Sequence, residues 1–334
     1  MVVELPAAHE IVGVESTLFV QVVMFLVFSL ILIKCASLAV KYIVQLAQHF
    51  NISEFVTSFL IAGFVSILPE FFIGVNSAIE GIPEIGIGAI IGNNIVDLTL
   101  VIGIVAILGK SIPTQRTDRI SSYGFLFALG LPLALMVDGF LSQVDGIVLV
   151  LTCIIYFILM LKNEPICEKK INSSWEKIAP ELVAFGIMVL LIFVSSHFVV
   201  TSAVEISHFI GFPEILAGLI LISIGAALPE LTFSIQAVMA HHKSVALGDV
   251  LGNVVLDATF SIGVMAIIFP FPVHVGIIGL AALFMVFSAL MVTTYMDDGH
   301  VLTRRDGIAL IGLFIVFVVV QITLNTALGG APHP

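Results

Sequence analysis

Charged residues are scarce in this chain of 334 residues. Only 10 % are Asp, Glu, Lys or Arg, whereas 60 % are hydrophobic, and the mean hydropathy is +1.21. A soluble globular protein carries about 25 % charged and about 45–50 % apolar residues. The shortage of charge therefore excludes an ordinary soluble domain and indicates a polytopic membrane protein.

Basic residues and cysteines are also few. Twelve Lys and Arg stand against 23 Asp and Glu and form no basic groove, so no nucleic-acid partner is expected. The three cysteines, Cys35, Cys153 and Cys167, are too widely spaced for a disulfide or metal framework. No "HExxH" motif of a metalloprotease occurs, and the stretch nearest to the "GxGD" of intramembrane aspartyl proteases is "ALGD" at 246–249.

Long apolar runs, in contrast, are abundant. A membrane-spanning helix needs about 20 mostly apolar residues. The chain is therefore predicted to be all-α, with ten transmembrane helices at 17–45, 52–80, 84–108, 119–138, 143–162, 180–207, 214–240, 245–270, 272–296 and 305–328.

The Lys and Arg residues between these runs predict the orientation. With the N-terminus outside, the outer connections and both termini hold no Lys or Arg, and every basic residue outside the spans faces the cytoplasm. We therefore expect a multi-pass protein of the plasma membrane with both termini outside. The residues that carry this prediction are Lys110, Arg116, Arg119, Lys162, Lys169, Lys170, Lys177, Lys243, Arg304 and Arg305.

The two halves of the chain resemble each other when one is shifted by 160 residues. "LPE" at 68–70 then meets "LPE" at 228–230, and "GNNIVDLTLVIG" at 92–103 meets "GNVVLDATFSIG" at 252–263. Each copy holds five spans, so the second must cross the membrane in the opposite sense. Inverted repeats are a recurring transporter architecture. We predict a first repeat at 1–162, a short cytoplasmic connector at 163–179 and a second repeat at 180–334, with ion-binding blocks at 54–103 and 214–263.

Four carboxylates lie well inside predicted spans: Glu70, Asp97, Glu230 and Asp257. An acidic residue at the centre of a membrane helix costs about 2.5–3.5 kcal/mol on insertion scales. The only basic residues within a span are Lys34 and Lys41, both in the first. Bound cations or protons are therefore expected to offset the four charges.

The neighbouring residues fit an oxygen-rich cation site. Asn93 and Asp97 are four residues apart and share a helix face, as do Asn253 and Asp257. A proline within a helix frees a backbone carbonyl, so Pro69 and Pro229 are predicted helix breaks. Ca²⁺ takes about six to eight oxygen ligands in flexible geometry. The predicted metal-binding set also includes Gly63, Ser66 and Ser223, with Asp249 and Ser77 as accessory residues.

A purely structural role remains open for several of these positions. The prolines alone could be kinks, and Asn93 and Asn253 could join neighbouring helices. Asp249 is expected at the cytoplasmic mouth as a solvated charge. Glu54 and Glu214 stand near predicted helix starts, where a carboxylate suits the helix dipole, so we interpret them as structural.

The two duplicated blocks, "GFVSILPEFFIGVNSAIEG…IGIGAIIGNNIVDLTLVIG" and "SIGAALPELTFSIQAVMAHHKSVALGDVLGNVVLDATFSIG", resemble the alpha repeats of the cation/Ca²⁺ exchanger superfamily, in particular prokaryotic sodium/calcium exchangers. The resemblance implies an antiporter that works by alternating access, in which the first and sixth spans slide against the other eight. It also implies that Glu70 and Glu230 are the central calcium ligands and that Asp97 and Asp257 occupy the family's Asn/Asp position.

Departures from the family pattern affect the counter-ion. The Thr-Ser pair before "LPE", whose hydroxyls help to bind sodium in the family, is Ser66–Ile67 in one copy and Ala226–Ala227 in the other. "LPE" and Asp257 nevertheless resemble sodium-coupled members, so we expect exchange of Ca²⁺ for Na⁺. A proton-coupled exchanger of Ca²⁺ or another divalent cation is the alternative, and a cation channel or an intramembrane aspartyl protease is more remote. We expect no enzyme activity, no cofactor and no obligatory protein partner; the partners are the transported ions and the lipid bilayer.

Overall fold

The computed structural model describes residues 8–49, 63–113, 119–161, 175–211, 214–239, 243–297 and 301–327, and these residues are almost entirely helical. Each predicted span coincides with a helix or with an interrupted helix. Residues 52–62 of the second predicted span lie outside the described residues, as does Glu54. The predicted all-α membrane fold is confirmed.

The first copy contains five spans. They are α1 (Ala8–His49), the interrupted pair α3 (Gly63–Ser66) and α4 (Leu68–Ile79), the continuous run α5 (Pro83–Val96), η2 (Asp97–Val101) and α6 (Ile102–Gly109), then α7 (Arg119–Leu135) and α8 (Gln143–Leu161). The segment η2 is π-helical.

The second copy repeats this order. It comprises α9 (Trp175–Ile210), the run α10 (Glu214–Leu216), η3 (Ala217–Ile222), α11 (Ser223–Ala226) and α12 (Leu228–Met239), the run α13 (Lys243–Leu256), η4 (Asp257–Ser261) and α14 (Ile262–Ile268), then α15 (Val275–Asp297) and α16 (Arg304–Ala327). The segments η3 and η4 are also π-helical. Glu214 is the first residue of α10, as its predicted place near a helix start requires.

Length and apolar composition alone mark six helices of the described residues as able to cross a membrane. The other predicted spans contain shorter or interrupted apolar helices, among them 68–79, 123–135, 143–159 and 217–226. Large apolar side chains are exposed on the outer helices, for example Leu30 on α1, Leu190 on α9 and Ile315 on α16. These are the surfaces that lipid would cover.

Two small antiparallel sheets join the copies. β1 (Ser111–Pro113) pairs with β4 (Val301–Thr303), and β2 (Phe140–Leu141) pairs with β3 (Phe271–Pro272). The 160-residue shift relates β1 to β3 and β2 to β4, so one pairing repeats the other with the roles of the copies exchanged. β1 and β4 both lie in connections that the Lys and Arg pattern assigns to the cytoplasm, whereas β2 and β3 lie in connections that it assigns to the outside.

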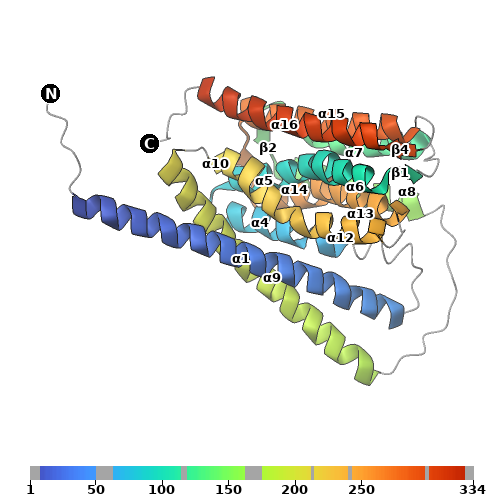
Figure 1. Ribbon diagram of the computed structural model, residues 1–334, viewed down its shortest axis with the longest axis horizontal. Helices are drawn as coiled ribbons and strands as arrows, with labels where there is room; N and C mark the ends of the chain where they lie inside the picture. Colours follow the sequence, from blue (N-terminus) through green and yellow to red (C-terminus); the bar gives the residue numbers. More distant parts are fainter. Residues whose placement is uncertain are drawn as a thin grey trace.

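The most deeply buried helices are the runs that contain η2 and η4 (Figure 1). They pack closely on glycines: a Cβ on Gly103 would meet the Gly307 carbonyl oxygen at 2.9 Å, and a Cβ on Gly263 would meet that of Gly146 at 2.9 Å. Glycine allows this approach of backbones, which is typical of helix contacts in membranes.

The helices α1 and α9 lie on the outside of this bundle. They cross each other on one side of it (Figure 1) and pack against each other along their length. One ring contact between them stacks Phe28 on Phe198 with centroids 4.2 Å apart. The first helix of each copy is therefore peripheral, and the second and third spans of each copy lie inside.

Candidate ion-binding site

The two "LPE" motifs occupy equivalent places in the two copies. The α-helix is interrupted at Ile67 and at Ala227, two residues before Pro69 and Pro229. Both glutamates lie in the first turn of the helix that follows. Glu70 is 0 % and Glu230 is 2 % exposed, so both carboxylates are held inside the protein.

The two aspartates also occupy equivalent places, each at the first residue of a π-helical segment. The backbone N–H of Ile102 donates to the carbonyl oxygen of Asp97, five residues back, and that of Ile262 does the same with Asp257. A threonine two residues after each aspartate donates its hydroxyl to the carbonyl oxygen four residues back, Thr99 to Ile95 and Thr259 to Val255. Such bonds bend helices, and π-helical bulges are frequent at functional sites.

An amide group joins the aspartates of the two copies. Asn93 Nδ2 donates to Asp97 Oδ2 at 3.3 Å and to Asp257 Oδ2 at 3.4 Å. A second hydrogen bond also joins the copies, because Ser66 Oγ of the first copy donates to Asn253 Oδ1 of the second at 2.8 Å. The residues that the sequence singled out in opposite halves are therefore in direct contact.

The four carboxylates lie close enough to interact electrostatically. The charge of Glu70 is affected by Glu230, Asp257 and Asp97, and that of Glu230 by Asp97 and Asp257. Lys34 and Lys41 are both exposed on α1 and do not neutralise this cluster. The repulsion among the carboxylates must therefore be relieved by cations or protons.

Several acceptor oxygens of the cluster are buried and make no hydrogen bond within the described residues. They are Glu70 Oε1 and Oε2, Asp97 Oδ1, Glu230 Oε2 and Asn93 Oδ1. An unpaired buried polar group is costly, and in the lipid-embedded part of a protein water cannot compensate freely. Hard carboxylate and amide oxygens are the ligands that Ca²⁺ prefers, so the set fits an oxygen-coordinated cation.

The described residues do not close around a single metal position. Within them, no three acidic, histidine or cysteine side chains form one metal-ligating group. Asn93 lies between the two aspartates instead. The structure brings the predicted residues together as a polar cluster, and a coordinated cation would require side-chain movement within it.

The predicted ligand Ser223 and the predicted accessory residue Ser77 both donate a hydrogen bond to their own helix. Ser223 Oγ donates to the Leu219 carbonyl oxygen at 2.6 Å, and Ser77 Oγ donates to that of Ile73. Ser77 and Ser223 are both fully buried. Gly63 is the first residue of α3.

The expectation that Asp249 is a solvated charge is wrong. Its side chain on α13 is only 7 % exposed, because α13 is packed against α12, α3 and η2. The local sequence places Asp249 near the cytoplasmic connection, but it does not show that neighbouring helices cover the side chain.

Two further buried polar residues lie near the cluster in the sequence: Ser261 contacts the site and was missed, whereas Asn94 lies against Met285. Ser261 Oγ donates to Asp257 Oδ1 at 2.9 Å, and Asn94 Nδ2 lies 3.5 Å from Met285 Sδ. Ser261 follows Asp257 by four residues, which was a usable signal. Comparison of the copies concealed both residues, because Val101 and Val254 occupy the equivalent positions.

Comparison with known families decides the classification. The sequence profile of the family described as sodium/calcium exchanger protein matches residues 20–162 and 181–323, one match on each copy. This chain belongs to the sodium/calcium exchanger protein family. A membrane protein of Methanocaldococcus jannaschii is 27 % identical over 282 residues, which cover 82 % of this chain and 89 % of that protein.

Solved exchangers have the same fold. The sodium-calcium exchanger NCX_Mj superposes with a TM-score of 0.67 at 24 % identity and covers 90 % of this chain and 99 % of its own. The H⁺/Ca²⁺ exchanger CAX superposes with a TM-score of 0.76 at 17 % identity and covers 92 % of this chain and 88 % of its own. The two-copy architecture is thus shared with exchangers named for different counter-ions.

Proposed function

We propose that this protein is a secondary-active antiporter that exchanges Ca²⁺ for Na⁺ across the membrane. The observation that carries the proposal is a set of buried acceptor oxygens that both copies contribute and that make no hydrogen bond within the described residues, on Glu70, Asp97, Glu230 and Asn93. Carboxylates that repel each other bind a divalent cation when they are ionised together. They release it when monovalent cations neutralise the carboxylates in place of the divalent ion.

The transported ions are the ligands of this site, and its chemistry requires no resident cofactor and no enzymatic step. Glu70 and Glu230 hold Ca²⁺ from opposite sides, with Asn93, Asn253 and the two aspartates as further oxygen donors. Ser66 orients Asn253 through its hydrogen bond, and Ser261 orients Asp257. Asn93 links the two aspartates, so a change at one copy is transmitted to the other.

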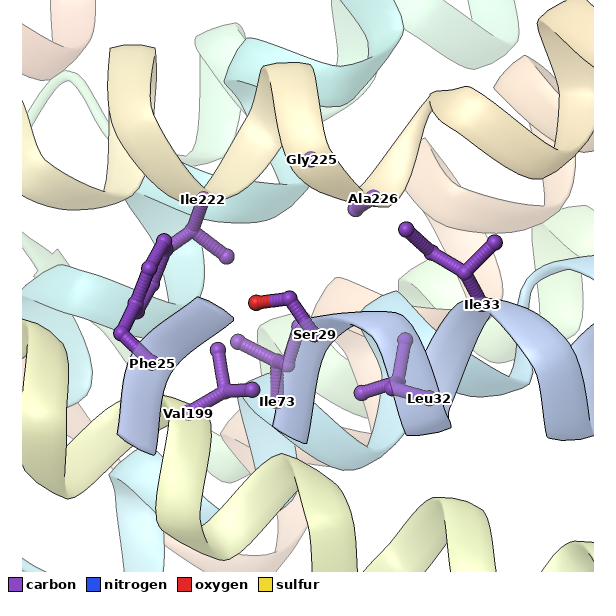
Figure 2. Close-up of a pocket in the computed structure, with 9 residues that line it drawn as sticks. All are labelled: Phe25, Ser29, Leu32, Ile33, Ile73, Val199, Ile222, Gly225 and Ala226. Atoms are coloured by element: carbon purple, nitrogen blue, oxygen red, sulfur yellow. The ribbon is translucent and has the colours of Figure 1, made fainter. Parts of the chain in front are cut away.

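Alternating access requires a part that moves. The contact of α1 with the bundle is largely apolar, and a small pocket with a cavity volume of about 10 Å³ lies between α1 and the helices η3 and α11 (Figure 2). Its lining includes Phe25 and Leu32 of α1 and Ile222 and Ala226 of the second copy, with the Ser29 hydroxyl directed into it. Sliding along such a surface breaks few hydrogen bonds, which supports a role for α1 as a moving gate.

The proposed orientation has both termini outside and the connector at 163–179 in the cytoplasm of a cell whose plasma membrane holds the protein. The Lys and Arg distribution supports this orientation. The strand pairing supports it too, because β1 pairs with β4 and β2 with β3, each within one predicted side. The start of α1 and the end of α16 also lie at the same end of the molecule (Figure 1).

Proton coupling is the second candidate. It is favoured by the absence of hydroxyls at Ala226 and Ala227, both buried, where the family resemblance associates hydroxyls with sodium. The likeness to CAX, named for H⁺/Ca²⁺ exchange, supports the same candidate.

Flux measurements test the proposal. Purified protein in liposomes should take up ⁴⁵Ca²⁺ when a Na⁺ gradient is imposed, and should take up none without a counter-ion gradient. Uptake driven by a pH gradient alone would establish the proton-coupled candidate. Uptake without any counter-ion gradient would indicate a channel and overturn the proposal.

A further inference from the structure

The buried carboxylate Asp249 breaks the symmetry of the site. It lies on α13 one turn before Asn253 and two turns before Asp257, so the three side chains share one helix face. The equivalent position in the first copy is Ala89, which is fully buried. The cluster therefore holds three carboxylates from the second copy and two from the first.

Asp249 is directed toward the cluster. Its charge affects those of Asp97 and Glu230, which belong to two other helices. A carboxylate that faced lipid from α13 would be remote from both. Within the described ranges, Asp249 makes no hydrogen bond or ion pair, and its side chain is 7 % exposed. The helix that carries Asp249 packs against η2 and α12, which carry Asp97 and Glu230, and Asp97 Oδ1 and Glu230 Oε2 make no hydrogen bond within the described residues.

The fifth carboxylate adds a single negative charge that has no counterpart in the first copy. A Ca²⁺ ion carries two positive charges and takes about six to eight oxygens. One monovalent cation is sufficient to neutralise one carboxylate. We propose that Asp249, together with Asp97 and Glu230, forms an additional position for one Na⁺ ion on the α13 side of the cluster, once these side chains close around the ion. The inference rests on the proposed exchange function and specifies its counter-ion site.

Binding measurements on purified protein test this inference without transport. The variant Asp249→Asn removes the charge and keeps the shape of the side chain. Its matched control is Asp138→Asn, because Asp138 is exposed and belongs to no part of the site. Bound ⁴⁵Ca²⁺ is displaced by increasing Na⁺ at constant pH and ionic strength, and calorimetry gives the Kd for Ca²⁺.

The proposal predicts that Asp249→Asn raises the Na⁺ concentration for half-displacement by about tenfold, since an opposite charge within a buried site is removed. The Hill coefficient of the Na⁺ displacement curve should also decrease, because one fewer Na⁺ competes with Ca²⁺. The Kd for Ca²⁺ should change by less than about threefold. Asp138→Asn should match the wild type in both measurements.

Three results would overturn the inference. The first is a Na⁺ displacement curve of Asp249→Asn that equals the control. The second is a loss of Ca²⁺ and Na⁺ affinity by the same factor, which would make Asp249 part of one shared site. The third is a folded variant that binds no Ca²⁺. If Asp249→Asn does not purify, Asp249→Ala, which copies Ala89 of the first repeat, gives the same test. Failure of the proposed function is distinct, because the wild-type protein would then bind no Ca²⁺ at all.

Discussion

The two copies agree at the residues that bind charge and differ in the residues around them. Glu70 matches Glu230 and Asp97 matches Asp257, and all four are buried. Each aspartate also begins a π-helical segment. Around them, Ser261 and Asp249 of the second copy correspond to Val101 and Ala89 of the first. The comparison teaches that the buried carboxylates can be repeated in both copies while the polar residues around them are not.

The first helices of the two copies, α1 and α9, show a similar difference. Asn76 Nδ2 on α4 donates to Ser196 Oγ at 2.6 Å and to the Phe193 carbonyl oxygen at 3.2 Å, both on α9. In α1 the residue equivalent to Ser196 is Ala36, which cannot accept such a bond. Hence α9 is joined to α4 by hydrogen bonds that the equivalent residue of α1 cannot make.

The largest expected effect tests the symmetric part of the comparison. Glu70→Gln and Glu230→Gln should each reduce Na⁺-driven ⁴⁵Ca²⁺ uptake by at least about 100-fold, since each removes a charged ligand of a buried divalent ion. Glu84→Gln, with the same substitution in the first turn of α5 outside the cluster, should transport normally. Near-normal uptake by both cluster variants would remove the basis for the site assignment.

The aspartates should affect the counter-ion more than calcium. Asp97→Asn keeps an oxygen that can accept the hydrogen bond from Asn93, and Asp257→Asn keeps an oxygen for one of the two bonds that Asp257 accepts, from Asn93 or from Ser261; both variants lose the charge. We expect the Na⁺ concentration for half-maximal uptake to rise by about tenfold, which is about 1.4 kcal/mol, with a smaller change for Ca²⁺. Equal losses for both ions, measured by flux titration, would contradict the separation of roles.

Two equivalent glycines give a matched test of packing. A Cβ on Gly88 would lie 2.7 Å from the Ile215 carbonyl oxygen, whereas among the described residues no atom lies within 4 Å of a Cβ on Gly248. Gly88→Ala should therefore destabilise the protein by about 1–3 kcal/mol, as overpacking does. Gly248→Ala should be neutral or stabilising by up to about 1 kcal/mol. Thermal unfolding in detergent measures both, and equal Tm values would show that the copies pack alike.

The smallest expected effect concerns the hydrogen bond between Asn76 of α4 and Ser196 of α9. Ser196→Ala removes the acceptor for Asn76 and should destabilise the protein by about 0.6 kcal/mol, the average for a hydrogen bond between membrane helices. Ser202→Ala on the same helix is the control, because the Ser202 hydroxyl is buried and makes no hydrogen bond among the described residues. Identical unfolding curves for the two variants would mean that the α4–α9 contact contributes no stability.

The sequence was sufficient to predict the arrangement of helices and the residues that meet in the site. Apolar length located the spans, and the repeat identified Glu70, Asp97 and their partners because polar residues that recur inside both sets of spans must be stabilised by a bound ion or by each other. It did not show that Asn93 links two aspartates across the copies, since such a contact depends on tertiary packing. It also missed Ser261 and misplaced Asp249, because a comparison of repeats gives weight only to what the repeats share.

The central claim is that carboxylates from two oppositely oriented copies hold the same transported cation. The most direct test is a crystal structure of the protein soaked with Sr²⁺ as an anomalous substitute for Ca²⁺. We predict one anomalous peak between Glu70 and Glu230 with oxygens of both residues as ligands. A peak ligated by one copy alone, or a fully occupied ion elsewhere with these glutamates unchanged, would contradict the account.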